Sequence, residues 1–376
     1  MQCTKLHELA DFGQSIWLDN ISRSMIESGK LRNWIERGLR GLTSNPSIFN
    51  QAISHSREYD RMIADLRAAG KSTFEIYDEL TIRDIRDAAD LFTPVYQASD
   101  GLDGYVSLEI NPELADDTAA SIQEGKRLFA KVGRPNLMIK VPATDAGFPV
   151  VSELLASGIN VNVTLIFSRQ QYRRTVQAYF EGVRKFTSLH SGTSRNRIRS
   201  VASVFVSRVD TAADKMIANR LADIQDETQR RSLAQLTGQA AQANCRLILE
   251  AWRELFSDAS AIRHMAVQRV LWGSTSTKNP DYSDIKYVSE LIACPTVNTV
   301  PEKTLLAFLD HGTVAPALRQ DVRQAEDILH ALHAHGISVD RICDQLLIDG
   351  VEAFQKAFGQ LLAAIETKAR QLCSSS

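Results

Sequence analysis

The sequence lacks the features of membrane, secreted and nucleic-acid-binding proteins. None of its stretches approaches the roughly 18 uninterrupted apolar residues of a membrane-spanning helix, and charged residues interrupt the N-terminal segment where a signal peptide would have an apolar core. The formal net charge is only −2, so no basic surface for nucleic acid is indicated. We therefore expect a cytoplasmic protein with no membrane or nucleic-acid partner.

Cysteine is scarce, and its spacing is unlike that of a disulfide framework or a zinc site. The five cysteines are scattered and include no Cys-x-x-Cys pair, so we expect reduced thiols. The single histidine cluster, His330, His333 and His335, lies in a helical pattern that turns His335 roughly 200° away from His333. Because the three side chains do not converge, we expect no metal ion.

Short β-like runs alternate with longer helical patterns along the chain. In one helical pattern, residues 116–133, Asp117 can cap the start and Gly133 can end the helix. Such alternation predicts parallel strands joined by right-handed crossovers, and eight repeats favour a closed (β/α)8 TIM barrel. An open doubly wound sheet is the alternative, although no Gly-x-Gly-x-x-Gly turn follows a strand. The eight predicted strands are 15–19, 41–45, 105–111, 136–143, 159–167, 199–207, 269–274 and 296–301.

The 376 residues are predicted to form one decorated barrel domain rather than several domains. A barrel of this type needs about 250 residues, and no sharp linker divides the chain. The surplus segments are polar and helix-rich. We expect them to form additional helices packed on the barrel, at about residues 1–13, 209–262 and 315–376.

Alternation within three predicted strands sorts aliphatic from polar residues. In YVSLEIN (105–111) the polar positions are Ser107 and Glu109, in NLMIKVPA (136–143) Lys140 is polar, and in INVNVTLIF (159–167) the polar positions include Asn162 and Thr164. In a barrel wrapped by helices, the aliphatic side faces the helices and the polar side faces inward. Near the C-terminal strand ends, inward-facing residues lie in the active-site mouth.

Lys140 can be interpreted in two ways. A buried ammonium is costly unless it is paired or neutralised. One interpretation is a structural ion pair with Glu109. The other is an amine that attacks a carbonyl to form a Schiff base, with the neighbouring carboxylate and a hydroxyl moving protons. We favour the second, because the inward-facing polar groups come from three neighbouring strands.

Four further polar residues follow strand ends. Asp19 can be a helix cap and Asn45, before Pro46, an ordinary turn residue. Arg208 and Lys278 follow the sixth and seventh strands, and either cation alone is typical of solvated surface. Their shared position at the barrel mouth favours function. A cation with hydroxyl donors there suits a phosphate monoester.

These stretches carry a resemblance to a known family. The chain resembles the transaldolases, in their subfamily of long bacterial-type sequences, from about residue 14 to 315. The resemblance implies a Schiff-base transferase of the pentose phosphate pathway with sugar-phosphate substrates and neither metal nor organic cofactor. It would move a dihydroxyacetone unit from sedoheptulose 7-phosphate to glyceraldehyde 3-phosphate, and a monomer and a homodimer both stay open. The matching stretches are QSIWLDNISR, RGLTSNPSIFNQAI, VSLEINPELADDT, NLMIKVPATDAG, GINVNVTLIFS, VASVFVSRVD and STKNPDYSD.

The resemblance also implies catalytic roles. Lys140 matches the Schiff-base lysine of the family. Asp19 matches the acid/base that deprotonates the C4 hydroxyl during carbon–carbon cleavage. Glu109 and Thr164 match the pair that holds a water for imine formation and hydrolysis.

The substrate-binding residues follow in the same way. Asn45 and Asn162 match residues that place the dihydroxyacetone hydroxyls, Ser203 lines the same pocket, and Arg208 matches a phosphate-binding arginine. Two positions depart from the family pattern. Lys278, after a Ser/Thr insertion, stands where the second phosphate cation is usually arginine, and Ser207 stands where many relatives have glycine.

Two other functions remain as alternatives. One is an aldolase of the same barrel family that releases free dihydroxyacetone. Phe205, in the sixth strand, is the transaldolase-like residue there, whereas tyrosine would favour the aldolase. The other is a catalytically silent sugar-phosphate-binding barrel, which would have no use for Lys140, Asp19 and Glu109 together.

Overall fold

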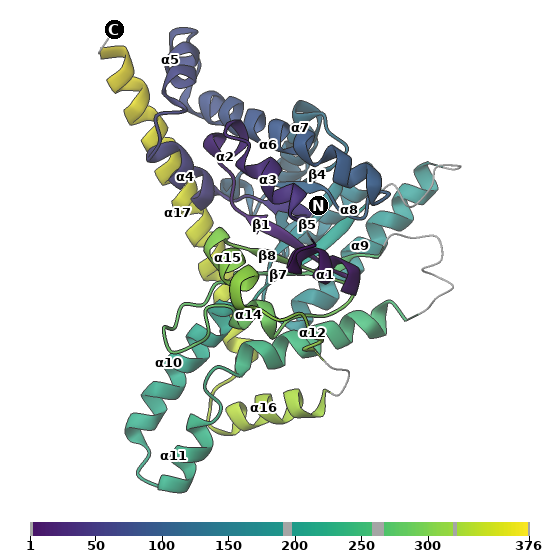
Figure 1. The fold of residues 1–376 in the computed structure, drawn as a ribbon, viewed down its shortest axis with the longest axis vertical. Helices are drawn as coiled ribbons and strands as arrows, with labels where there is room; N and C mark the ends of the chain where they lie inside the picture. Colours follow the sequence, from purple (N-terminus) through teal and green to yellow (C-terminus); the bar gives the residue numbers. More distant parts are fainter. Residues whose placement is uncertain (1–2, 191–197, 258–266, 319–321, 375–376) are drawn as a thin grey trace.

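Eight parallel strands close into a barrel in the computed structural model, which describes residues 3–190, 198–257, 267–318 and 322–374. Each strand pairs with its neighbours in the sequence, and β1 closes the ring by pairing with β8 (Figure 1). The predicted TIM barrel is confirmed, and the open sheet is wrong. The strands are β1 (Gln14–Asp19), β2 (Gly41–Thr43), β3 (Tyr105–Glu109), β4 (Leu137–Pro142), β5 (Asn160–Ile166), β6 (Ser200–Phe205), β7 (Arg269–Gly273) and β8 (Thr296–Val300).

Helices follow the strands, with local capping that the sequence indicated. Asp117 caps α7 by accepting a hydrogen bond from the amide of Ala120, and Gly133 ends that helix at φ +65°. The helices up to β6 are α1 (Lys5–Phe12), α2 (Arg23–Glu27), α3 (Lys30–Glu36), α4 (Pro46–Ser54), α5 (Asp60–Ala68), α6 (Thr73–Ala98), the 3-10 helix η1 (Pro112–Leu114), α7 (Thr118–Val132), α8 (Gly147–Ala156) and α9 (Arg169–Leu189). After β6 come α10 (Ser207–Asp223), α11 (Glu227–Ala234), α12 (Ala240–Leu255), α14 (Lys286–Ser289), α15 (Glu302–His311), α16 (Arg323–Ala334) and α17 (Val339–Ser374). No helix in the described ranges is both long and apolar enough to cross a membrane.

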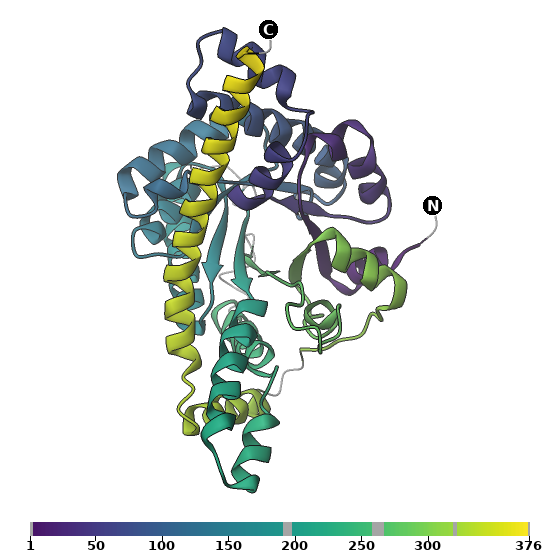
Figure 2. The same ribbon diagram turned by 90° about the vertical axis from the view of Figure 1, so that its left-hand side faces the viewer.

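The segments in which additional helices were expected contain α1, then α10 to α12, then α16 and α17. Residues 258–262 of the second segment lie outside the described residues. The last helix does more than pack on the outside of the barrel. It runs from α10 and α16 at one end to α4 and α5 at the other (Figure 2), and between them it contacts β5 and η1. This path brings α17 across the C-terminal ends of the strands.

The lower part of the barrel interior is a packed apolar layer. Gly41 makes room for the largest member, because a Cβ there would stand 2.5 Å from a ring carbon of Trp17. The layer fills this part of the barrel interior, as side chains do in barrels of this type. Its members are Trp17, Tyr105, Met138, Val201, Leu271 and Val297.

Above this layer the strand register brings polar residues side by side. Glu109 pairs with Lys140 across β3 and β4, and Lys140 pairs with Asn162 across β4 and β5. Asp19 pairs with Thr43 across β1 and β2. The alternation in the sequence therefore predicted which side of β3, β4 and β5 faces inward, and the register decides which of these residues are neighbours.

Candidate active site

A cavity of about 230 Å³ opens at the C-terminal ends of the strands. Polar side chains and backbone from most of the strands converge there, together with one residue of α17. Most of the residues predicted from the sequence line it, but Glu109 and Asn162 do not. The lining residues are Asp19, Thr43, Asn45, Ser47, Lys140, Thr164, Ser203, Phe205, Arg208, Leu271, Gly273, Ser274, Ser276, Lys278, Thr299, Pro301 and Phe354.

Lys140 lies at the base of the cavity and is only 4% exposed. Its ammonium donates a hydrogen bond to the carbonyl oxygen of Ser44 at 2.9 Å and lies 3.6 Å from Glu109 Oε2. A charge-assisted N–H···O bond is usually about 2.7–2.9 Å long. The Lys140–Glu109 contact is therefore looser than a structural ion pair needs, and this favours the chemical interpretation over the structural one.

Glu109 is buried beside the cavity, in a smaller pocket under α17. Burial raises the pKa of Glu109 to about 7, against the opposing attraction of Lys140, and the nearby charge of Asp19 adds to the rise. Glu109 Oε2 accepts no hydrogen bond from the described residues. A carboxyl group with a pKa near neutrality and a free oxygen can both accept and return a proton.

Thr164 presents a second unused polar atom. Its hydroxyl is buried and has no hydrogen-bond partner among the described residues. Thr164 pairs with Pro142 at the end of β4, two residues beyond Lys140, so its hydroxyl and the Glu109 carboxylate flank the lysine. Buried polar atoms without a protein partner are places where an ordered water is expected.

Asp19 is held by the hydroxyl group of Thr43 on β2, which also contacts a hydroxyl group of β8. Thr43 Oγ1 donates to Asp19 Oδ1 at 2.7 Å and lies 2.6 Å from Thr299 Oγ1. Burial raises the pKa of Asp19, while the charge of Lys140 opposes the rise. The helix-cap interpretation of Asp19 is wrong, because Ser22 caps α2. Asp19 is thus a carboxyl group directed to the cavity and oriented by a threonine.

The two asparagines have different surroundings. Asn45 caps α4, accepting a hydrogen bond from the amide of Ile48 at 3.0 Å, and also lines the cavity. Asn162 is fully buried below the lining. Its amide nitrogen donates to Ser107 Oγ at 3.1 Å, and its oxygen accepts from Ser203 Oγ at 2.6 Å. In this structure Asn162 therefore positions Ser203 rather than reaching the cavity surface itself.

Arg208 projects into the cavity from the first turn of α10. Its guanidinium carbon lies 5.4 Å from the centre of the Phe205 ring, and Phe205 in turn packs edge-on against Phe167. Burial lowers the pKa of Arg208, while the charge of Asp349 on α17 raises it. Within the described ranges no side chain forms an ion pair or a hydrogen bond with the guanidinium group. Arg208 is therefore available to an anionic ligand.

Lys278 lies on the loop after β7 and is more exposed. Its ammonium contacts Ser276 Oγ at 2.9 Å, and both residues line the cavity. The same loop is fastened to α10, because Tyr282 OH donates to Asp214 Oδ2 at 2.6 Å and Ser207 Oγ lies 3.0 Å from Ser274 Oγ. These contacts hold Lys278 on the same side of the cavity as Arg208.

Sequence reasoning missed Thr43, Thr299, Ser44 and Phe354. The two threonines had a usable signal, since each is a polar residue at an inward position near the end of a predicted strand. Ser44 contributes only its backbone oxygen, for which residue type gives no indication. Phe354 lies in the middle of α17, and nothing in its local pattern separates it from an ordinary helix-core residue.

Comparison with known proteins shows the family to which the chain is similar. The sequence profile of the family Transaldolase/Fructose-6-phosphate aldolase matches residues 16–365. A transaldolase of Trichodesmium erythraeum is 41% identical over 379 residues, covering 99% of both chains. Transaldolase 2 of a Nostoc species is 42% identical over 380 residues, also covering 99% of both. A transaldolase of Mycobacterium tuberculosis is 43% identical over 375 residues, covering 98% of this chain and 97% of the relative.

Proposed function

Because the chain belongs to the transaldolase/fructose-6-phosphate aldolase family, we propose that it is a transaldolase with Lys140 as its Schiff-base residue. As a transferase of the pentose phosphate pathway, it moves a dihydroxyacetone unit from sedoheptulose 7-phosphate to glyceraldehyde 3-phosphate. One observation carries the proposal. Lys140 is a buried amine at the base of a polar cavity, 3.6 Å from a carboxyl group whose free oxygen can move protons.

The first half-reaction begins with attack of the Lys140 amine on the C2 carbonyl of the donor. The carbinolamine loses its C2 hydroxyl as water when Glu109 supplies a proton, and this gives the imine. A water between Glu109 and the Thr164 hydroxyl would occupy the two unused polar atoms beside the lysine. The same water can later add to C2 when the imine is hydrolysed.

Carbon–carbon cleavage requires a base at the C4 hydroxyl of the donor. We assign this role to Asp19, which lines the cavity and is oriented by Thr43. Removal of the hydroxyl proton lets the C3–C4 bond break, with its electron pair delocalised into the imine. The aldehyde product departs, and the three-carbon unit stays on Lys140 as an enamine. Attack of that enamine on the acceptor aldehyde reverses the sequence, and Asp19 then returns the proton.

The phosphate groups of donor and acceptor are assigned to Arg208 and Lys278. Both line the same cavity, and the guanidinium of Arg208 has no ion-pair partner among the described residues. Burial strengthens the attraction of such a cation for a phosphate monoester. Asn45 and Ser203 are assigned to the hydroxyl groups of the dihydroxyacetone unit. Asn162 acts through the Oγ of Ser203.

We further propose that the protein acts in the cytoplasm, where thiols stay reduced. Its five cysteines form no disulfide, and the buried Cys343 donates its S–H to the carbonyl oxygen of Phe167 at 3.3 Å.

A trapping experiment tests the proposal. Incubation with fructose 6-phosphate in the absence of an acceptor should leave the three-carbon unit on Lys140, and borohydride should reduce it to a stable amine. Peptide mass spectrometry should find the adduct on the peptide that contains Lys140. Lys140→Arg should abolish both adduct and turnover, because arginine cannot act as an amine nucleophile at neutral pH.

Lys126→Arg, on the surface of α7, is the matched control and should retain both. An adduct on a different lysine would move the active site. Full activity of Lys140→Arg would return Lys140 to a structural ion pair with Glu109.

A further inference from the structure

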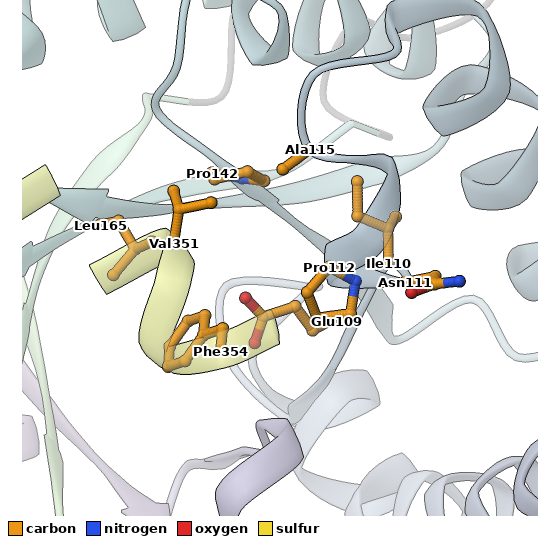
Figure 3. Close-up of a pocket in the computed structure, with 9 residues that line it drawn as sticks. All are labelled: Glu109, Ile110, Asn111, Pro112, Ala115, Pro142, Leu165, Val351 and Phe354. Carbon is orange, nitrogen blue, oxygen red and sulfur yellow. The ribbon is translucent and has the colours of Figure 1, made fainter. Parts of the chain in front are cut away.

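Phe354 of α17 forms a wall between two spaces at the active site. It is 6% exposed, and it lines both the substrate cavity and the smaller pocket that contains Glu109. Figure 3 shows Phe354 and Val351 projecting from α17, with the Glu109 carboxylate directed toward the helix. The centre of the Phe354 ring lies 6.0 Å from the Lys140 ammonium. Phe354 is the residue of the cavity lining that comes from neither a barrel strand nor the segment directly after one.

Close packing against β5 holds this part of α17 in place. Gly350 permits the approach, because a Cβ at that position would stand 2.9 Å from a methyl carbon of Leu165. Leu165 itself has φ +59°, in an irregularity of β5 immediately after Thr164. A branched residue in the left-handed region is strained, and such strain persists where the surrounding structure fixes it.

Two contacts on the far side of Phe354 complete the attachment. Gln355 donates a hydrogen bond to the carbonyl oxygen of Pro112 at 3.2 Å. One turn further along the helix, Phe358 packs edge-on against Tyr77, with ring centres 5.1 Å apart. The position of Phe354 is therefore fixed from both ends, by β5 on one side and by η1 and α6 on the other.

On the side away from the substrate cavity, the small pocket beside Glu109 is mostly apolar. It is lined otherwise by Ile110, Asn111, Pro112, Ala115, Pro142, Leu165 and Val351, and the Oδ1 atom of Asn111 already accepts a hydrogen bond from the amide of Glu113. The polar atoms without a partner near Phe354 are few among the described residues, namely Glu109 Oε2 in this pocket and the Thr164 hydroxyl in the adjoining substrate cavity. Such a site suits one positioned water and excludes a larger cluster.

We propose that Phe354 is a specificity-determining residue, which keeps bulk solvent from the three-carbon intermediate on Lys140 so that the unit passes to an aldehyde instead of leaving as free dihydroxyacetone. This inference rests on the function proposed above. Phe205 lines the same cavity from β6. Phe354, from the C-terminal helix α17, is thus a second aromatic ring in the cavity wall.

The chemistry that Phe354 opposes has two steps. First, the enamine carbon takes a proton from solvent, which forms a C–H bond and leaves an iminium at C2. Water then adds to C2 and the C2–Nζ bond breaks, with its electron pair returning to Nζ. One water and one proton are consumed, and the products are dihydroxyacetone and the Lys140 ammonium. Both steps are faster when solvent reaches the enamine, whereas formation of the new carbon–carbon bond needs only the aldehyde, and the single water beside Glu109 and Thr164 serves the later hydrolysis of the product imine.

The test compares Phe354→Ala with Phe354→Leu. Two rates are measured for each variant: release of free dihydroxyacetone from fructose 6-phosphate without an acceptor, and transfer to glyceraldehyde 3-phosphate. Opening the wall with Ala should raise the ratio of release to transfer on the order of tenfold. Leu keeps most of the apolar wall, so its ratio should stay within about twofold of the wild type.

The lifetime of the intermediate is an independent readout. Borohydride added at intervals after the donor is removed should trap the adduct for a shorter time in Phe354→Ala than in the wild type. Ile348→Ala, on a part of α17 where the side chain is 53% exposed, is the control and should change neither the ratio nor the lifetime. An unchanged ratio in Phe354→Ala, or an equal fall in both rates, would overturn the inference.

A variant at another position tests the inference if Phe354→Ala does not fold. Val351 lines the pocket beside Glu109 but not the substrate cavity, so Val351→Ser should admit solvent without touching the substrate. It should raise the same ratio, and failure to do so in a folded variant would count against the inference. Absence of a wild-type adduct on Lys140 would overturn the proposed function together with this inference. A normal wild-type adduct with unchanged ratios in all variants would overturn the inference alone.

Discussion

The ammonium of Lys140 lies 3.6 Å from Glu109 Oε2, yet its hydrogen bond goes to the Ser44 carbonyl oxygen. The main chain therefore fixes the direction of the amine, and the carboxylate keeps an oxygen without a partner among the described residues. A carboxylate that satisfied the lysine fully would be less able to exchange a proton with a substrate. The first two predictions follow from this arrangement of Lys140 and Glu109.

Glu109→Gln should keep the fold and lower turnover by roughly 10²- to 10⁴-fold, because the shape is retained while a positioned proton carrier is lost. Steady-state kcat with fructose 6-phosphate and erythrose 4-phosphate measures the effect. Circular dichroism shows whether the variant is folded. Near-wild-type turnover would remove Glu109 from the mechanism.

The pH dependence of kcat/KM for the donor should show an acidic limb with an apparent pKa near 7. Burial raises the pKa of Glu109 to about 7, so this carboxyl group becomes protonated as the pH falls through that value. A protonated Glu109 cannot accept the proton that is released when the amine attacks the carbonyl. Activity should therefore fall as the pH drops through about 7, and this limb should be missing in Glu109→Gln. If Glu109→Gln shows an acidic limb at the same pH, a group other than Glu109 causes it.

Asp19→Asn should separate imine formation from cleavage. The amide can still accept the hydrogen bond from Thr43, so the local structure is expected to survive, but it cannot take a proton from the C4 hydroxyl. After incubation with fructose 6-phosphate, borohydride should trap the whole six-carbon donor on Lys140, and no three-carbon adduct should accumulate. If no adduct of either size forms, Asp19 acts earlier than proposed.

Arg208→Ala should discriminate between acceptors. One charge-assisted contact contributes on the order of 1.5–3 kcal/mol to binding, so its loss should lower kcat/KM for glyceraldehyde 3-phosphate by at least about tenfold. The value for unphosphorylated glyceraldehyde should change little.

Lys278→Ala should show the same selectivity in weaker form because its ammonium is more exposed. Arg61→Ala on α5, where the side chain is 95% exposed, is the control. Equal losses for both acceptors would argue against a phosphate role.

Gly41→Ala should destabilise the barrel. The added Cβ would stand 2.5 Å from Trp17 in the interior layer, and overpacking of this kind typically costs about 1–3 kcal/mol. Urea unfolding measures the change. Gly359→Ala is the matched control, because nothing lies within 4 Å of its Cβ on the exposed side of α17. Alanine is the better helix former, so the control should gain up to about 1 kcal/mol. Equal stability of the two variants would contradict the packing argument.

The sequence by itself determined the barrel, and most of the site residues predicted from it line the cavity. Strand and helix periodicities differ, so the eight strands could be recognised, and closure of the barrel followed from their number and parallel order. The position of Lys140 on the polar side of β4 was readable because inward and outward residues alternate along a strand. Asp19 and Asn45 were recognised in the same way, as polar residues at strand ends.

Tertiary structure alone decided the contacts between segments distant in the sequence. The register across β3 and β4 sets the 3.6 Å between Lys140 and Glu109, and burial in the assembled barrel raises the pKa of Glu109 to about 7. Asn162 has the predicted orientation but lies below the cavity surface, a matter of depth that alternation cannot give. Phe354 reaches Lys140 because Gly350 lets α17 approach Leu165 closely. Helical periodicity identifies the buried face of α17. It does not identify β5 as the element against which that face packs, because nearly two hundred residues of chain separate the two elements. No local pattern encodes such a contact.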